Sequence, residues 1–156
     1  MNKKKVLVPL DGSDLAACTL AHVKDLASSG VVEDVTLLNV FGPLEVPLGE
    51  GYNMSSLKNY QMLRDESLAN SKKYLDGLKT DLAAAGISVR TDSIESKFNV
   101  AETIAEYAEK NRMDLIVIAT HGRSGLKKLL LGSVATGVAQ QSNVPVYLIR
   151  PAACRL

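Results

Sequence analysis

The residues with the clearest chemical potential lie in the segment GRSGLKKLLLGS, Gly122 to Ser133. An apolar run typical of a buried strand, Leu115 to Ile118, precedes this segment, and a helical pattern from Val134 to Gln141 follows it. Glycines let a backbone approach an anion closely, and the first N–H groups of a helix attract negative charge. The segment therefore predicts a phosphate site, while a plain strand end and helix start is the alternative interpretation.

Polar side chains in and beside this segment could add to a phosphate site. Ser133 could cap the following helix and also offer its hydroxyl to a phosphate oxygen. Arg123, Lys127 and Lys128 could add positive charge, although we expect at least one of them to be solvated surface. His121 could contact a ligand, or it could orient the loop through a hydrogen bond.

Buried-strand patterns alternate with helical patterns along the chain, which is typical of a parallel sheet covered on both faces. The predicted strands are Val6 to Leu10, Val35 to Phe41, Ser88 to Glu95, Asp114 to Ala119 and Val144 to Ile149. The predicted helices are Leu15 to Ser28, about Lys58 to Ala85, Asn99 to Arg112 and about Val134 to Gln141. The sequence therefore predicts an α/β fold.

Composition limits the classes of protein that fit this fold. A length of 156 residues with 46% apolar content suits a single domain with a sizeable core. A net charge of +1 and the absence of Trp argue against a nucleic-acid partner. No apolar run approaches the length of a membrane span, and the apolar run after the basic start is too short for a signal peptide. We therefore expect a cytoplasmic protein without a membrane partner.

Ligands of parallel α/β sheets bind outside the carboxyl ends of the strands. Asp11-Gly12-Ser13 follows the first predicted strand, and Ser13 is a plausible helix N-cap. The connection 42–57 follows the second strand, and its length predicts a mobile loop that is a lid, a binding loop or a disordered segment. The glycine segment follows the fourth strand. If the first and fourth strands are neighbours, all of these features converge on one crevice, which favours a nucleotide site.

Several catalytic motifs are absent. The sequence has no G-x-x-x-x-G-K-[ST] phosphate loop, and Gly122 to Gly125 is one residue short of the G-x-S-x-G pattern of hydrolases. Only two histidines are present, so a metal centre held by protein ligands alone is not expected. We identify no dedicated catalytic base, nucleophile or metal ligand.

The chain resembles the universal stress protein family over nearly its whole length. The segments that carry the resemblance are Val6 to Ser13, Leu37 to Val40, Asp114 to Gly122 and Ser142 to Ile149. The ATP-binding branch of that family carries G-x-x-G, nine residues and then G-[ST]. Here Gly122, the nine residues after it and Gly132-Ser133 match this motif, while Ala119 stands at the place of the first glycine.

The resemblance implies an open, Rossmann-like five-stranded parallel sheet of the adenine nucleotide alpha hydrolase type, with strand order 3-2-1-4-5. It implies that Asp11 contacts the nucleoside, although a turn carboxylate is the alternative role, and that Val40 meets adenine through its backbone. It also implies that Gly122, Gly132 and Ser133 hold the phosphates of the nucleotide, and that these phosphates carry a Mg²⁺ ion. The predicted binding residues are Pro9, Asp11, Val40, Ala119, Gly122, Arg123, Gly125, Gly132, Ser133 and Val134.

The resemblance implies a regulatory ATP-binding protein of the stress response with an unidentified protein partner. Because no dedicated catalytic base or nucleophile is identified, we expect slow or no ATP hydrolysis. Another adenine nucleotide could replace ATP. The family also implies a homodimer through Val144 to Ile149. A nucleotide-independent dimeric scaffold is the alternative. An adenylating enzyme of related fold fits less well, because Asp11-Gly12-Ser13-Asp14 lacks the paired glycines of that class.

Overall fold

Strands and helices alternate through residues 3–42, 54–97, 99–120 and 131–150, which this computed structural model describes. The strands are β1 (Lys4–Pro9), β2 (Val32–Phe41), β3 (Val89–Glu95), β4 (Leu115–Ala119) and β5 (Val146–Ile149). The helices are α1 (Asp14–Ala17), α2 (Thr19–Ser28), α3 (Met54–Ala84), α4 (Val100–Lys110) and α5 (Ser133–Gln141). The strands pair in parallel in the order β3-β2-β1-β4-β5, which confirms the predicted sheet.

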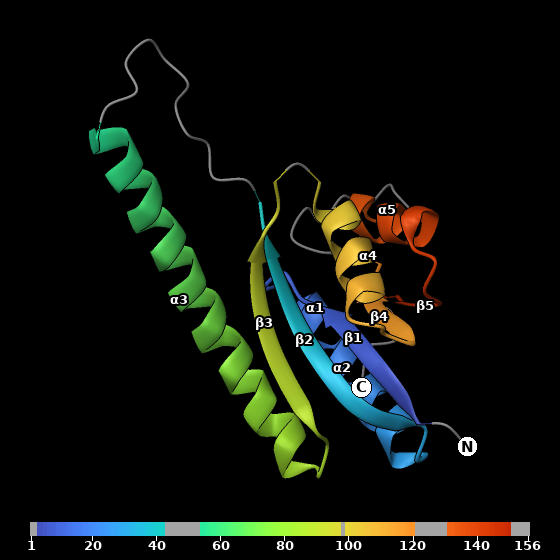
Figure 1. The fold of residues 1–156 in the computed structure, drawn as a ribbon. Helices are drawn as coiled ribbons and strands as arrows, with labels where there is room; N and C mark the ends of the chain where they lie inside the picture. The colour runs from blue at the N-terminus through green and yellow to red at the C-terminus, as the bar shows by residue number, and fades with distance from the viewer. Residues whose placement is uncertain (1–2, 43–53, 98, 121–130, 151–156) are drawn as a thin grey trace.

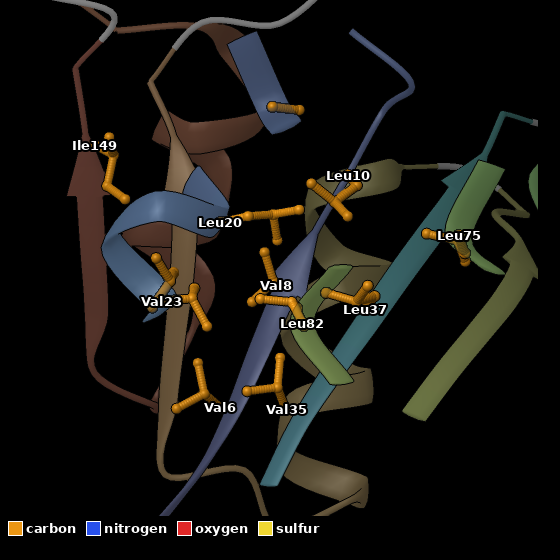
Figure 2. Close-up of a cluster of buried hydrophobic side chains, with 12 residues drawn as sticks. Val6, Val8, Leu10, Leu20, Val23, Val35, Leu37, Leu75, Leu82 and Ile149 are labelled. Atoms are coloured by element: carbon orange, nitrogen blue, oxygen red, sulfur yellow. The ribbon is translucent and has the colours of Figure 1, made fainter. Parts of the chain in front are cut away.

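Helices cover both faces of this sheet (Figure 1). Successive side chains of a strand point to opposite faces, so a strand buried on both sides is apolar throughout. In β1, Val6 and Val8 pack with residues of α2 and α3, whereas Leu7 packs with residues of α4 and α5. Figure 2 shows the first of these clusters, in which Leu20 and Val23 of α2 meet the valines of β1.

The first predicted helix, Leu15 to Ser28, is wrong as a single element, because it is divided at Cys18 into α1 and α2. The hydroxyl of Thr19, which is fully buried, donates to the Ala16 carbonyl oxygen at 2.6 Å. Such a bond competes with the regular helical ladder, and hydrophobic periodicity does not reveal it. The two short helices still present one apolar side to the core, because Ala16, Leu20 and Val23 are all buried.

Helix α3 is 31 residues long and begins at Met54, four residues before the predicted start at Lys58. The end of the predicted mobile loop 42–57 is therefore helical, while residues 43–53 lie outside the described ranges. Only the carboxyl-terminal part of α3 has fully buried leucines, Leu75 and Leu82. Despite its length α3 is too polar to cross a bilayer, and none of the other helices in the described ranges could do so either.

Candidate functional site

A cavity of about 240 Å³ opens where β1, β2 and β4 end and α5 begins. Residues from these separate parts of the chain meet there because neighbouring parallel strands end at the same edge of the sheet. Most of the predicted binding residues line this cavity: Pro9, Asp11, Val40, Ala119, Gly132, Ser133 and Val134. The remaining three, Gly122, Arg123 and Gly125, lie outside the described residues.

The loop after β1 carries Asp11 to the wall of the cavity. Gly12 has a φ of 83°, a conformation that side chains disfavour, so a glycine suits this turn. Ser13 caps α1 as predicted, with its hydroxyl oxygen accepting from the Ala16 amide at 3.1 Å. One carboxylate oxygen of Asp11 accepts from the Ser13 amide at 2.9 Å. Asp11 therefore has the turn role that the sequence left open, and it also borders the cavity.

The end of β2 contributes Val40 to the cavity. The preceding residue, Asn39, donates from its side-chain amide to the carbonyl oxygen of Leu10 at 2.7 Å. This bond ties the end of β2 to the residue just before Asp11. Asn39 was not predicted as a site residue, although a polar residue inside the apolar run Leu37 to Val40 was a signal for it.

The opposite wall is formed by the end of β4 and the start of α5. The Gly132 amide donates to the Thr120 carbonyl oxygen, and the Thr120 amide donates to the Ile149 carbonyl oxygen at 2.8 Å. The N-cap of α5 is Gly132, with extended φ and ψ, and no side chain caps the helix. The prediction that Ser133 caps α5 is therefore wrong. Ser133 is instead the first residue of the helix, and its side chain is exposed at the cavity.

The inner surface of the cavity is largely apolar, and the sequence analysis did not assign its residues to the site. They come from the ends of β1 and β4 and from α1, α4 and α5: Leu10, Ala16, Ile118, Val100, Ile104 and Ala135. These residues have the same apolar types and periodic spacing as ordinary core residues. Sequence alone therefore gives no sign that they face a cavity instead of another side chain.

The family model described as "Universal stress protein family" matches residues 2–150. The chain belongs to the universal stress protein family. Universal stress protein MJ0577 of Methanocaldococcus jannaschii is 30% identical, over 94% of this chain and 94% of that protein.

Solved structures of the family have the same fold. The structure of MJ0577 matches with a TM-score of 0.80 and 28% identity, over 96% of this chain and 97% of that one. A universal stress protein in complex with cAMP matches with a TM-score of 0.65 and 21% identity, over 94% of this chain and 96% of that one. An Arabidopsis thaliana family protein with AMP bound has a TM-score of 0.64 and 15% identity, over 94% and 91%.

The clearest electrostatic effects in this universal stress protein lie away from the cavity, on β3. A hydrogen bond to Glu95 raises the pKa of Tyr60, whose hydroxyl lies 2.8 Å from both carboxylate oxygens. Burial, followed by a 2.9 Å hydrogen bond to Asp92, raises the pKa of Tyr107. Both tyrosines connect a helix to β3, so we assign them to stability and not to ligand binding.

Proposed function

We propose that this universal stress protein binds ATP in the cavity and acts as a regulatory protein whose surface changes with nucleotide occupancy. The observation that carries the proposal is the meeting of Asp11, Val40, Gly132 and Ser133 around one cavity. A ligand that orders the loops around it shifts the protein towards one conformation, and a partner protein can then distinguish that conformation. Cytoplasmic location and slow or absent hydrolysis remain part of this proposal.

The chemistry of the cavity supports a nucleoside with its phosphates directed towards α5. Its apolar surface suits an adenine ring, and Asp11 can accept hydrogen bonds from ribose hydroxyls. A volume of about 240 Å³ is small beside typical ligand pockets of about 300–1,000 Å³, so it suits the nucleoside part of the ligand. The first turn of α5 offers unpaired N–H groups to phosphate oxygens. Relatives of the same fold solved with cAMP and AMP support an adenine nucleotide.

Mg²⁺ enters this proposal only through the phosphates. The described residues contain no group of three or more His, Cys, Asp or Glu side chains that could hold a metal ion. A Mg²⁺ ion that keeps most of its waters and binds phosphate oxygens needs few protein ligands. We therefore assign no residue of this chain to the metal.

Thermal unfolding with and without ATP and Mg²⁺ tests the proposal, after mass analysis for nucleotide carried through purification. A ligand at 100 times its dissociation constant adds about 2.7 kcal/mol of stability. For a chain of this length that corresponds to a rise in midpoint of roughly 5–10 °C. Parallel melts with AMP and cAMP separate ATP from other adenine nucleotides. If none of the three nucleotides shifts the midpoint and none is carried over, the proposal is wrong.

Gly132→Val adds bulk at the cavity wall and is expected to abolish the ATP-dependent shift. Gly77→Val in α3 is the matched control, because a Cβ added at Gly77 has no heavy atom within 4 Å. Gly132→Val replaces a tolerated N-cap residue by a poor one and changes the cavity. Gly77→Val leaves the cavity unchanged and should not lower helix propensity, because Val is a better helix former than Gly. Loss of the shift in both variants would point to a general effect on folding and not to the site.

The alternative, a nucleotide-independent dimeric scaffold, rests on β5. This strand lies at the edge of the sheet, and Tyr147 in its middle is 45% exposed. An edge strand presents backbone groups that a second copy can pair with, whereas a Lys on such a strand discourages pairing. Under the dimer proposal, Tyr147→Lys gives a smaller particle in sedimentation. A dimer that forms equally with and without ATP, in a protein with no nucleotide-dependent melt, would favour the scaffold.

A further inference from the structure

The hydrogen-bond ladder between β1 and β2 ends beside the cavity, and its last carbonyl accepts from a side chain instead of from the backbone. The Leu10 amide donates to the Leu38 carbonyl oxygen at 2.8 Å, which places Leu10 opposite Asn39 in the parallel register. In a continuing parallel ladder, the next donor to the Leu10 carbonyl would be the backbone amide of Val40. In the structure the side-chain amide of Asn39 donates to the Leu10 carbonyl oxygen instead, at 2.7 Å.

We propose that Asn39 is a positioning residue that ends this ladder one rung early, so that the backbone N–H of Val40 is directed to the ligand. Without the Asn39 amide, the Leu10 carbonyl would take the Val40 N–H as its donor. The same bond fixes Leu10, and with it the neighbouring Asp11. A single side chain thereby sets both the base-contacting and the ribose-contacting positions of the cavity. This inference rests on the proposed function, because it assigns a role within the nucleotide site.

The placement of Asn39 separates this role from direct contact. Side chains alternate along β2, and Leu37 belongs to the cluster with α2 and α3 whereas Leu38 belongs to the cluster with α4 and α5. Asn39 therefore points to the side of Leu37, and Val40 packs with Leu38. Val40 borders the cavity and Asn39 is not among the residues that line it. Asn39 therefore acts on a ligand through the backbone of its neighbours.

A consequence for specificity follows from the direction of the Val40 N–H. A backbone donor at the base fits adenine, whose N1 accepts a hydrogen bond, and opposes guanine, whose N1 carries a hydrogen. A donor facing a donor leaves both groups unpaired, and an unpaired buried group is costly. Asn39 should therefore determine discrimination between bases, and it should have little effect on the binding of phosphate groups alone.

The test measures the dissociation constants of ATP, GTP and tripolyphosphate by calorimetry for the wild type, Asn39→Ala and Asn39→Asp. Asn39→Ala removes the donor, and we expect about tenfold weaker ATP binding, the equivalent of one hydrogen bond. Binding of tripolyphosphate should change by less than about twofold, within the scatter of distant substitutions. GTP binding should weaken less than ATP binding does, because GTP shares the ribose contact but not the contact between the Val40 N–H and the base. Asn39→Asp places a carboxylate against the Leu10 carbonyl oxygen and should weaken ATP binding at least as much.

Asn111→Ala is the matched control. The Asn111 side chain also donates to a backbone carbonyl oxygen, that of Tyr107 at 2.9 Å, but at the end of α4 away from the cavity. This variant should leave all three dissociation constants unchanged. If Asn39→Ala weakens ATP, GTP and tripolyphosphate equally, or if it lowers only the melting temperature, Asn39 has a general structural role and the inference is overturned.

Amide hydrogen exchange of unliganded protein gives a readout that needs no ligand. The Val40 amide should exchange rapidly in the wild type and at least about tenfold more slowly in Asn39→Ala, where it can join the ladder. Equal protection in both proteins would overturn the inference. If the wild type binds ATP but Asn39→Ala retains both affinity and base preference, only this inference fails. If the wild type binds no nucleotide, the proposed function fails with it.

Discussion

On the β1–β2 side of the cavity, side chains hold the backbone in place, whereas on the β4–α5 side backbone groups hold one another. Asp11 and Ser13 each accept a backbone amide within the loop after β1, and Asn39 donates across to Leu10. Each of these contacts disappears with one substitution. The first side should therefore respond to the removal of hydrogen-bonding groups.

On the second side, main-chain groups connect the end of β4 to β5 and to the start of α5. The Gly132 amide bonds to Thr120, and the Thr120 amide bonds to Ile149, all through the main chain. These main-chain bonds do not depend on a side-chain hydrogen-bonding group, but an added side chain changes the approach of the backbone. The difference indicates two routes by which sequence change can alter one site, namely loss of hydrogen-bonding groups and gain of bulk.

The largest expected effect is on ligand binding at the first side. Asp11→Ala should weaken ATP binding roughly 10- to 100-fold, the range for hydrogen bonds to a charged group. Asp14→Ala is the control, because Asp14 is an exposed acid in the first turn of α1. Calorimetric titration of both variants measures the difference. Equal losses would mean that general negative charge near α1, and not the position of Asp11, affects binding.

On the second side, the corresponding test adds a methyl group. A Cβ built at Gly137 of α5 would lie 2.6 Å from the Cβ of Ala101 in α4, which is too close for real Cβ atoms. Gly137→Ala should therefore lower the free energy of unfolding by about 1–3 kcal/mol, as overpacking does. Urea unfolding measures this change.

Two further variants test whether the clash is the cause. Adding Ala101→Gly to Gly137→Ala should restore most of the lost stability, because it removes the opposing methyl group. Gly77→Ala in α3, where a Cβ contacts nothing within 4 Å, should raise stability by about 0.5–1 kcal/mol. A double variant as unstable as Gly137→Ala alone would contradict the close packing of α4 on α5.

Ser13 and Ser133, one on each side of the cavity, should differ in their effect on stability by a smaller amount. Ser13→Ala removes the side-chain cap of α1 and should cost about 1 kcal/mol in the free energy of unfolding. Ser133→Ala should change stability by less than about 0.5 kcal/mol, because Ser133 is not the cap of α5 and is exposed. Chemical denaturation of the two variants gives the answer. A larger loss for Ser133→Ala would reverse the assignment of the caps.

The smallest expected effect is on stability at alkaline pH, and it comes from a tyrosine that lies on neither side of the cavity. The pKa of Tyr107 is raised above its ordinary value of 10.0, so the folded state holds this proton more tightly than the unfolded state does. Its contribution to stability is complete below pH 10 and is lost as the pH rises above that value. Tyr107→Phe should therefore show a shallower decline in melting temperature above pH 10. If the wild type and Tyr107→Phe lose melting temperature equally above pH 10, Tyr107 does not contribute to the pH dependence of stability.

The sequence predicted the five strands, a sheet with helices on both faces, and the convergence of Asp11, Val40 and Gly132 at one edge of the sheet. These predictions succeeded because apolar periodicity reports burial, and the carboxyl ends of parallel strands must meet at one edge. The break at Cys18 was missed because it involves a single hydrogen bond of Thr19. The role of Asn39 was missed because it depends on a residue 29 positions away, Leu10, which only the sheet brings near.

Strand β1 lies at the centre of the sheet, and one of its two neighbours, β4, comes from a distant part of the chain. The Lys5 amide donates to a carboxylate oxygen of Asp114, 109 residues further on, at 2.8 Å. Closing a loop of this length carries an entropic cost, and contacts between residues far apart in the sequence slow folding. A ribosome must have made almost the entire chain, up to α5, before the cavity can exist. A nascent or truncated protein can therefore hold most of its secondary structure and still be unable to bind a ligand.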